Sequence, residues 1–144
     1  MTDQNELIDM DFASGIAAFE AKNFTHAMRL LLPFAEKGDA DAQHRVAIMY
    51  QNGLGVVTNE QQASRWMRAS AEAGNPVAQH GLGFMYLEGE CLAQDVPEAI
   101  EWFKKAADQG LVGSLTTMAM LYEEGRGVEK DTEEAQRLYK LAGF

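Results

Sequence analysis

The sequence predicts an all-α fold, a right-handed α-solenoid of about four antiparallel helix hairpins and eight helices. The first observation is an internal repeat, because like residues recur at an offset of 36 positions along most of the chain. Met49 and Tyr50 return as Met85 and Tyr86, and Tyr86 is matched again by Tyr122. A repeat of this length is the sequence signature of a helical solenoid. The second observation is the apolar pattern inside each unit, which has the helical period.

The unit at 76–111 shows why each repeat is expected to fold as a helical hairpin. Apolar residues at helical spacing predict a first helix over 76–88, and Gly89 ends it because glycine accepts the left-handed conformation. Asp95 is an N-cap for a second helix over 95–109, and Glu98 completes a capping-box-like pair. Gly83 and Ala99 lack bulk, which allows the two antiparallel helices to approach closely.

The same reasoning places every helix of the chain in order. The expected helices are 7–21, 23–37, 40–52, 59–73, 76–88, 95–109, 112–124 and 131–142. Residues 1–5 are polar and are expected to fray. We therefore predict a single helical-repeat domain over 1–144, in which a first hairpin at 1–39 precedes repeats at 40–75, 76–111 and 112–144.

The turn and the second helix of each unit resemble a known family. The resemblance rests on two stretches of sequence. One is the pattern A-x-x-x-L-G-x-M-Y-x-x-G-x-x-x-x-x-D-x-x-x-A-x-x-W-F-x-x-A-A-x-x-G, and the other is the string LYEEGRGVEKDTEEAQRLYKLAG over 121–143. They resemble the Sel-one-like repeat (SLR) family, which is related to tetratricopeptide repeats. In one departure, Cys91 stands where Gly55 and Gly127 hold the second turn glycine. The first hairpin is closer to a tetratricopeptide repeat, because its turn at Lys22 and Asn23 is shorter.

Composition excludes several classes of function. The formal net charge of −10 argues against binding nucleic acid or an anionic membrane surface. No segment has the length of a membrane span, and the first residues lack the pattern of a signal peptide. The single cysteine rules out an internal disulfide framework, which suits a reducing compartment. A cytoplasmic location is therefore expected.

No catalytic, cofactor or metal site is expected from the sequence. His44 and His80 occupy the same repeat position, and neighbouring helix axes lie roughly 8–10 Å apart. That separation is too wide for one zinc ion, which binds each ligand at about 2.0–2.1 Å. Cys91 lies in a turn with no base beside it in any readable motif, whereas a catalytic cysteine needs one. The chain is therefore predicted not to be an enzyme.

Function is expected to depend on the surface of the first helices, because these line the concave binding side of a solenoid. Ile48, Phe84 and Met120 are spaced 36 residues apart and form an apolar strip that suits an extended or helical peptide. The alternative, that these residues only pack between repeats, stays open. The candidate groove residues are His44, Ile48, Gln51, His80, Phe84, Leu87, Thr116, Met120 and Glu123.

The resemblance implies a non-catalytic protein–protein interaction module, an adaptor or scaffold of bacterial type that binds a protein or peptide partner. Two alternatives stay open. One is an enzyme or an enzyme-regulating subunit with a hydrolase-like activity, as proposed for some cysteine-rich relatives. The other is a structural oligomer, in which Leu138, Leu141 and Phe144 form a weak homodimer contact.

Overall fold

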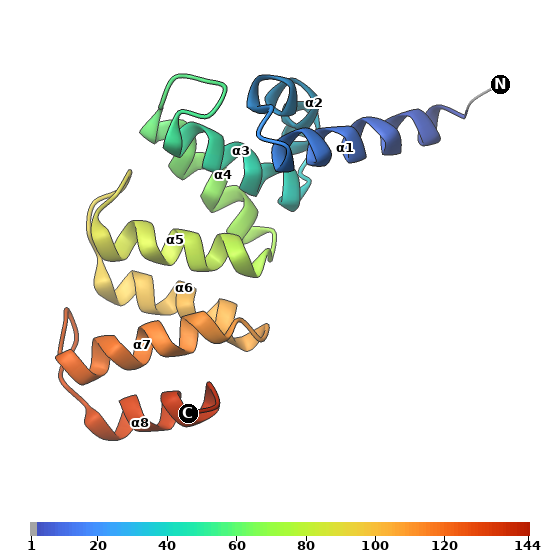
Figure 1. Cartoon of the computed structure of the whole chain (residues 1–144). Coiled ribbons are helices and arrows are strands. Elements are labelled where there is room, and N and C mark those ends of the chain that lie inside the picture. Colours follow the sequence, from blue (N-terminus) through green and yellow to red (C-terminus); the bar gives the residue numbers. More distant parts are fainter. Residues whose placement is uncertain (1–2) are drawn as a thin grey trace. The chain divides into compact units, whose positions relative to one another are not determined.

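A computed structural model describes residues 3–144, and these residues form eight α-helices and no strand (Figure 1). The helices are α1 (Gln4–Glu20), α2 (Phe24–Glu36), α3 (Ala40–Asn52), α4 (Glu60–Glu72), α5 (Pro76–Glu88), α6 (Val96–Asp108), α7 (Val112–Glu124) and α8 (Thr132–Leu141). The predicted all-helical class and the eight helices are confirmed. Residues 1–2 of the segment that was expected to fray lie outside the described residues.

The chain divides into two compact units, which we call the N-terminal unit (up to Ala73) and the C-terminal unit (Gly74–Phe144). Each unit contains two antiparallel hairpins, α1–α2 with α3–α4 and α5–α6 with α7–α8 (Figure 1). Inside each unit, the second helix of one hairpin packs on the first helix of the next, α2 on α3 and α6 on α7. The repeated hairpin of the sequence is therefore the structural building block.

The helix caps explain why the helix boundaries repeat. The Asp95 carboxylate accepts a hydrogen bond from the Glu98 backbone N–H at 3.1 Å. Asn59 caps α4 and Asp131 caps α8 in the same way. The first helices end at Gly53, Gly89 and Gly125, which have φ of 67°, 67° and 65°. The predicted N-caps and glycine C-caps are confirmed.

The prediction that Glu98 completes a capping box is wrong. In a capping box, the glutamate side chain would accept the backbone N–H of the N-cap residue. Instead, the Asp95 N–H donates to the Tyr86 carbonyl at 2.9 Å. The equivalent bonds join Asn59 to Tyr50 at 3.0 Å and Asp131 to Tyr122 at 2.9 Å. We call this backbone bond the turn latch, because it closes each turn between the first and second helix of a repeat.

Glycine residues allow close packing at two kinds of position, one between the two helices of a hairpin and one in the turn after a first helix. A Cβ atom on Gly83 would lie 2.6 Å from the Phe103 ring, so glycine is required for α5 to pack on α6. A Cβ atom on Gly127 would lie 2.5 Å from Val96. Cys91 adopts the same left-handed backbone, with φ of 64°. The substitution of the turn glycine by cysteine therefore leaves the turn conformation unchanged.

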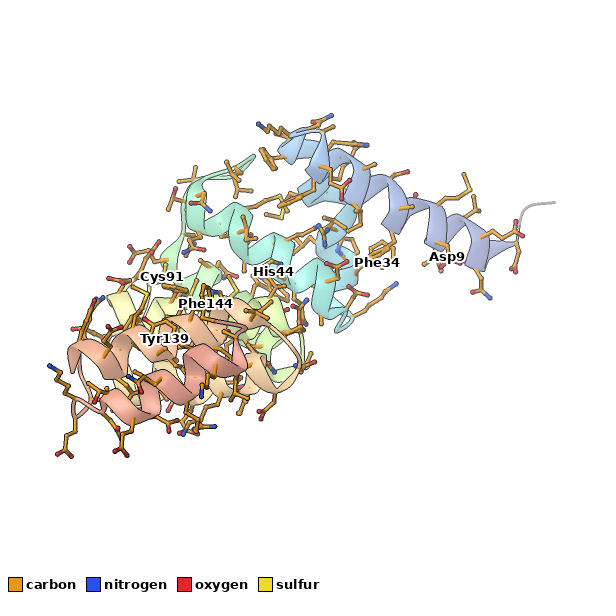
Figure 2. The ribbon with its side chains drawn as sticks, turned by 60° about the horizontal axis from the view of Figure 1, so that its bottom comes forward. Asp9, Phe34, His44, Cys91, Tyr139 and Phe144 are labelled. Carbon is orange, nitrogen blue, oxygen red and sulfur yellow. The ribbon has the colours of Figure 1, made fainter. Side chains whose placement is uncertain are left out.

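Helix α1 starts earlier than the sequence indicated. Asp3 caps it by accepting a hydrogen bond from the Asn5 N–H at 3.3 Å, so residues 4 and 5 are helical and not frayed. The first two turns of α1 are exposed, including Leu7 and Met10, and they extend past the end of α2 (Figure 1). Asp9 lies on this extension (Figure 2). No helix within residues 3–144 combines the length and apolar character needed to cross a bilayer.

The core of the C-terminal unit joins its four helices. Its buried members are Leu87, Val96, Ala99, Ile100, Phe103, Met118, Ala119, Leu121 and Leu138. Leu138 therefore lies inside the unit and is unavailable as a surface contact, which corrects its assignment to the predicted homodimer patch. Leu141 and Phe144 are exposed.

Candidate functional site: an apolar pocket between α5 and α7

A pocket of about 240 Å³ opens between the first helices of the C-terminal unit, and we call it the α5–α7 pocket. Phe84 and Met120 flank it with exposed fractions of 37% and 50%. Its lining also contains Leu87 and Leu121, which are buried members of the core. The remaining lining residues are Glu88, Thr117, Glu124 and Arg126. The pocket thus has an apolar interior and charged residues at one end.

Aromatic contacts hold the Phe84 ring in place. Its centroid lies 4.9 Å from the His80 ring and 5.3 Å from the Phe103 ring, both in edge-to-face arrangements. The His80 and Phe103 rings are 5.4 Å apart. Since Phe103 is fully buried beneath Gly83, it provides a rigid support for the exposed ring. These contacts therefore hold the Phe84 ring in one orientation at the edge of the pocket.

His80 also connects α5 to α7. Its Nδ1 atom lies 2.7 Å from the Ser114 hydroxyl oxygen, a hydrogen-bond distance. Burial lowers the pKa of His80 below the ordinary histidine value. The sequence analysis missed this pair, although a signal existed, because serine replaces the alanine that Ala42 and Ala78 hold in the other repeats. A buried hydroxyl requires a hydrogen-bond partner.

The His80–Ser114 distance is also that of a nucleophile and its base. Ser114 is fully buried, however, so a substrate cannot reach its hydroxyl group. The pair therefore acts as a structural link between two helices. Within residues 3–144, no group of three or more histidine, cysteine or acidic side chains is arranged to hold a metal ion.

On α7, the pocket is lined by the sequence neighbours of two expected groove residues. Glu123 accepts a hydrogen bond from the Tyr139 hydroxyl at 2.8 Å, and Thr116 donates to the Gly113 carbonyl at 3.0 Å. Neither residue lines the α5–α7 pocket, whereas their neighbours Thr117 and Glu124 do. The sequence-predicted residues that the structure brings together are therefore Phe84, Leu87 and Met120, with His80 in contact with Phe84.

The other three expected groove residues belong to the N-terminal unit. His44, Ile48 and Gln51 lie on α3 and are half-buried (His44 is labelled in Figure 2). Burial lowers the pKa of His44, and the neighbouring Arg45 charge lowers it further, against an opposing contribution from Asp41. The α5–α7 pocket is built without these residues.

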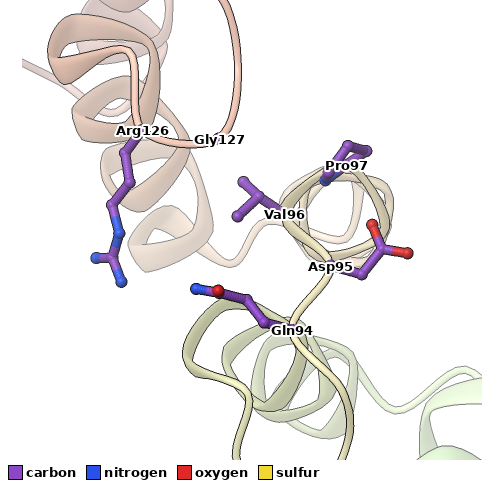
Figure 3. A pocket seen from close by; sticks show the side chains of 6 residues that line it. All are labelled: Gln94, Asp95, Val96, Pro97, Arg126 and Gly127. Carbon is purple, nitrogen blue, oxygen red and sulfur yellow. The ribbon is translucent and has the colours of Figure 1, made fainter.

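A second hollow of about 430 Å³ lies where the α6 N-terminus meets the turn after α7 (Figure 3). Its side chains already have structural roles. Asp95 caps α6, and the Gln94 amide donates to the Leu87 carbonyl at 2.8 Å. Val96 is buried beside Gly127. This hollow therefore offers few free groups to a ligand, and the α5–α7 pocket is the stronger candidate.

Helical hairpins that recur at a fixed spacing define the chain as a helical-repeat protein. The Sel1 repeat model matches residues 40–75, 76–111 and 115–143, so the chain belongs to the Sel1 repeat family. The resemblance noted in the sequence is confirmed. Sel1 repeat proteins are generally protein-interaction modules, and their fold is typically a non-enzymatic scaffold. Comparison with curated protein sequences finds no match.

Two solved bacterial structures are similar to this chain. A Sel1 repeat protein from Oxalobacter formigenes is 32% identical with a TM-score of 0.83, over 92% of this chain and 53% of that protein. A protective antigen of uropathogenic Escherichia coli strains, which displays an SLR fold, is 27% identical with a TM-score of 0.89. That match covers 96% of this chain and 31% of the antigen. The chain thus spans about half or less of the length of these proteins.

Proposed function

We propose that this chain is a non-catalytic interaction module, an adaptor or scaffold, that binds a peptide or protein segment in the α5–α7 pocket. The observation that carries the proposal is the pair of exposed apolar side chains, Phe84 and Met120, on either side of an apolar pocket. The volume of about 240 Å³ is below the roughly 300–1,000 Å³ of ordinary small-molecule sites. A pocket of this size suits one large apolar side chain of a partner.

The proposal places the centre of recognition at Phe84, Leu87 and Met120. Interface hot spots favour aromatic anchors in pockets that exclude water. Thr116 and Glu123 are proposed to flank the bound segment, beside the residues that line the pocket. His44, Ile48 and Gln51 remain predictions from the repeat spacing alone.

The test is a selection of short random peptides against the whole chain, followed by affinity measurements on the enriched peptides by fluorescence anisotropy. The test variant is Met120→Glu, which removes an exposed apolar side chain from one side of the pocket. The matched control is Met10→Glu, because Met10 is a methionine of similar exposure, at 60%, on α1 of the other unit. We expect Met120→Glu to weaken binding at least about tenfold, while Met10→Glu leaves the affinity unchanged.

The proposed function is wrong if no selected peptide loses affinity on Met120→Glu. It is also wrong if Met10→Glu reduces affinity by the same factor, since the effect would then reflect net charge and not the pocket. Thermal unfolding of both variants separates a loss of binding from a loss of folding.

A weak homodimer is a second candidate, which Leu141 and Phe144 favour. They are exposed by 59% and 80% on and just after α8. The Phe144 ring packs edge-on against Tyr139 with centroids 6.2 Å apart, so the two aromatic groups lie together (Figure 2). Clustered exposed apolar residues are typical of contact surfaces.

We also propose the cytoplasm as the compartment of this module. The proposal is supported by the single cysteine, which cannot form a disulfide within the chain. Disulfides are rare in proteins of reducing compartments such as the cytoplasm. Fractionation of cells that produce the natural protein tests it, and recovery outside the cytoplasmic fraction would contradict it.

A further inference from the structure

One end of the α5–α7 pocket carries a negative charge without a counter-charge. Glu88 and Glu124 are the last residues of α5 and α7, so the pocket lies beside the C-terminal turns of both helices. Arg126 pairs with Glu88 at 3.2 Å. Glu124 has no cationic partner within the part of the chain that the structure describes. One carboxylate at the edge of the pocket is therefore uncompensated.

The two helix ends add negative potential at the same place. A helix C-terminus carries the equivalent of about half a negative elementary charge, because the peptide dipoles of the helix align along its axis. Neither α5 nor α7 has a basic residue in its last turn. The neighbouring Glu123 accepts a hydrogen bond from Tyr139, a neutral group that leaves its charge in place. This hydrogen bond, with the charges of Glu123 and Glu124, raises the pKa of Tyr139.

An acidic partner would meet an unfavourable surface here. Arg126 is the cation among the residues that line the pocket, and Glu88 already neutralises it. An incoming carboxylate would also face Glu124 and the two helix C-termini. A cationic partner would instead gain from each of these groups. The net charge of −10 adds long-range attraction for basic segments.

We infer that the α5–α7 pocket recognises a basic peptide segment, in which a large apolar side chain enters between Phe84 and Met120 and a neighbouring Lys or Arg pairs with Glu124. This inference rests on the proposed function and names the chemistry of the partner. In a helical segment, the basic residue would follow or precede the apolar anchor by three or four positions, which places both on one face.

The test uses the peptides selected against the chain and a charge exchange at Glu124. The binding constants are measured at low ionic strength, where surface charges are least screened. Glu124→Lys reverses the charge on an exposed residue in the last turn of α7, where a cation is compatible with the helix dipole. The control is Glu101→Lys, because Glu101 is an exposed glutamate on α6 that pairs with Lys104 and does not line the pocket.

We expect the selected peptides to contain a basic residue near an apolar anchor. Glu124→Lys should weaken them by roughly 3- to 10-fold, and Glu101→Lys should change affinity less than about twofold. Replacement of the basic residue of the peptide by Glu should cause a similar loss with the wild-type protein. The same acidic peptide should recover affinity with Glu124→Lys, which would show that the side chain at position 124 pairs directly with the exchanged residue of the peptide.

The inference is overturned if peptides that depend on Met120 lack basic residues, or if the acidic peptide does not recover with Glu124→Lys. In that case the pocket still binds peptides, so the proposed function stands and only the basic specificity is lost. If no peptide depends on Met120, the proposed function fails and the inference fails with it.

Discussion

Phe84 and Phe103 touch each other in the C-terminal unit, yet their surroundings differ. Phe103 is fully buried beneath α5, while Phe84 is only partly covered at the pocket. The sequence pattern indicated that Phe84 belongs to a binding strip or to the packing between repeats. One side of the Phe84 ring packs against His80 and Phe103, and the other side is exposed at the pocket. Substitution of each phenylalanine therefore tests the proposed binding role of Phe84 against the packing role of Phe103.

Phe84→Ala should reduce peptide affinity by at least about tenfold and lower the free energy of unfolding by about 1–2 kcal/mol. Phe103→Ala should cost about 3–5 kcal/mol, because it leaves a cavity in the core. Chemical denaturation and fluorescence anisotropy on both variants measure the two effects. An equal loss of stability in the two variants would show that Phe84 serves mainly as a core residue.

Gly89 has a left-handed backbone that few other residues accept. Its φ is 67°, and an added Cβ would lie 3.2 Å from the Gln94 side chain. Gly89→Val should lower the free energy of unfolding by more than about 1 kcal/mol, because a β-branched residue is poorly tolerated at positive φ. Thermal unfolding checks this, and an unchanged melting temperature would contradict the assigned role.

The boundaries of individual helices were predicted correctly where the helix ends carry strong local signals. Asp95, Asn59 and Asp131 mark the starts of second helices, and glycine marks the ends of first helices, so those boundaries were predicted within one residue. Helix α1 was less predictable, because its first two turns have little tertiary support and its cap at Asp3 precedes the apolar pattern. The repeat spacing therefore predicted the positions of the hairpins better than it predicted where helix α1 begins.

The candidate site was only partly predictable for a different reason. A fixed spacing shows which residues are equivalent, but not which neighbour a side chain contacts in the last turn of a helix. Glu123 contacts α8 through Tyr139, while Glu124 faces the pocket. The His80–Ser114 bond depends on residues 34 positions apart. Such pairs follow from packing between helices, which periodicity does not specify.

The burial of His80 between α5 and α7 also makes stability depend on pH. Burial keeps the pKa of His80 lower in the folded state than in the unfolded chain, where it is about 6.5. The unfolded state therefore binds more protons as pH falls below about 6.5, and stability decreases in that direction. His44 has the same sign, because burial also lowers its pKa.

We expect the free energy of unfolding to fall between about pH 6.5 and pH 5, above the range in which most carboxylates titrate. The double variant His44→Gln with His80→Gln should flatten this dependence. Urea denaturation across the pH range measures it. A slope that is the same in wild type and variant would exclude the two histidines as the cause.

At the scale of the whole molecule, the exposed Leu141 and Phe144 predict that two copies associate through the end of the C-terminal unit. The combined variant Leu141→Glu and Phe144→Glu should shift any dimer toward monomer, because it places charges on both exposed apolar residues. Leu138 is left intact, since it is buried in the core. Sedimentation analysis at increasing concentration measures the shift.

The control for this experiment is Val57→Glu, an exposed apolar residue in a turn of the N-terminal unit. It should leave the association unchanged. A wild-type protein that stays monomeric at every accessible concentration would remove the homodimer from consideration and leave peptide binding as the proposed function.

The turn latch has a consequence for how the number of repeats in such a chain can change. Gly53, Gly89 and Gly125 end their helices with almost the same φ, and each following turn is closed by the same backbone bond. The three sites are therefore geometrically equivalent points at which two gene copies can recombine in frame. A crossover between them adds or removes 36 residues and leaves the turn itself intact, while the helices on either side of that turn come from different hairpins. Repeat number can thus change through single duplication events, without a period in which a turn must be rebuilt.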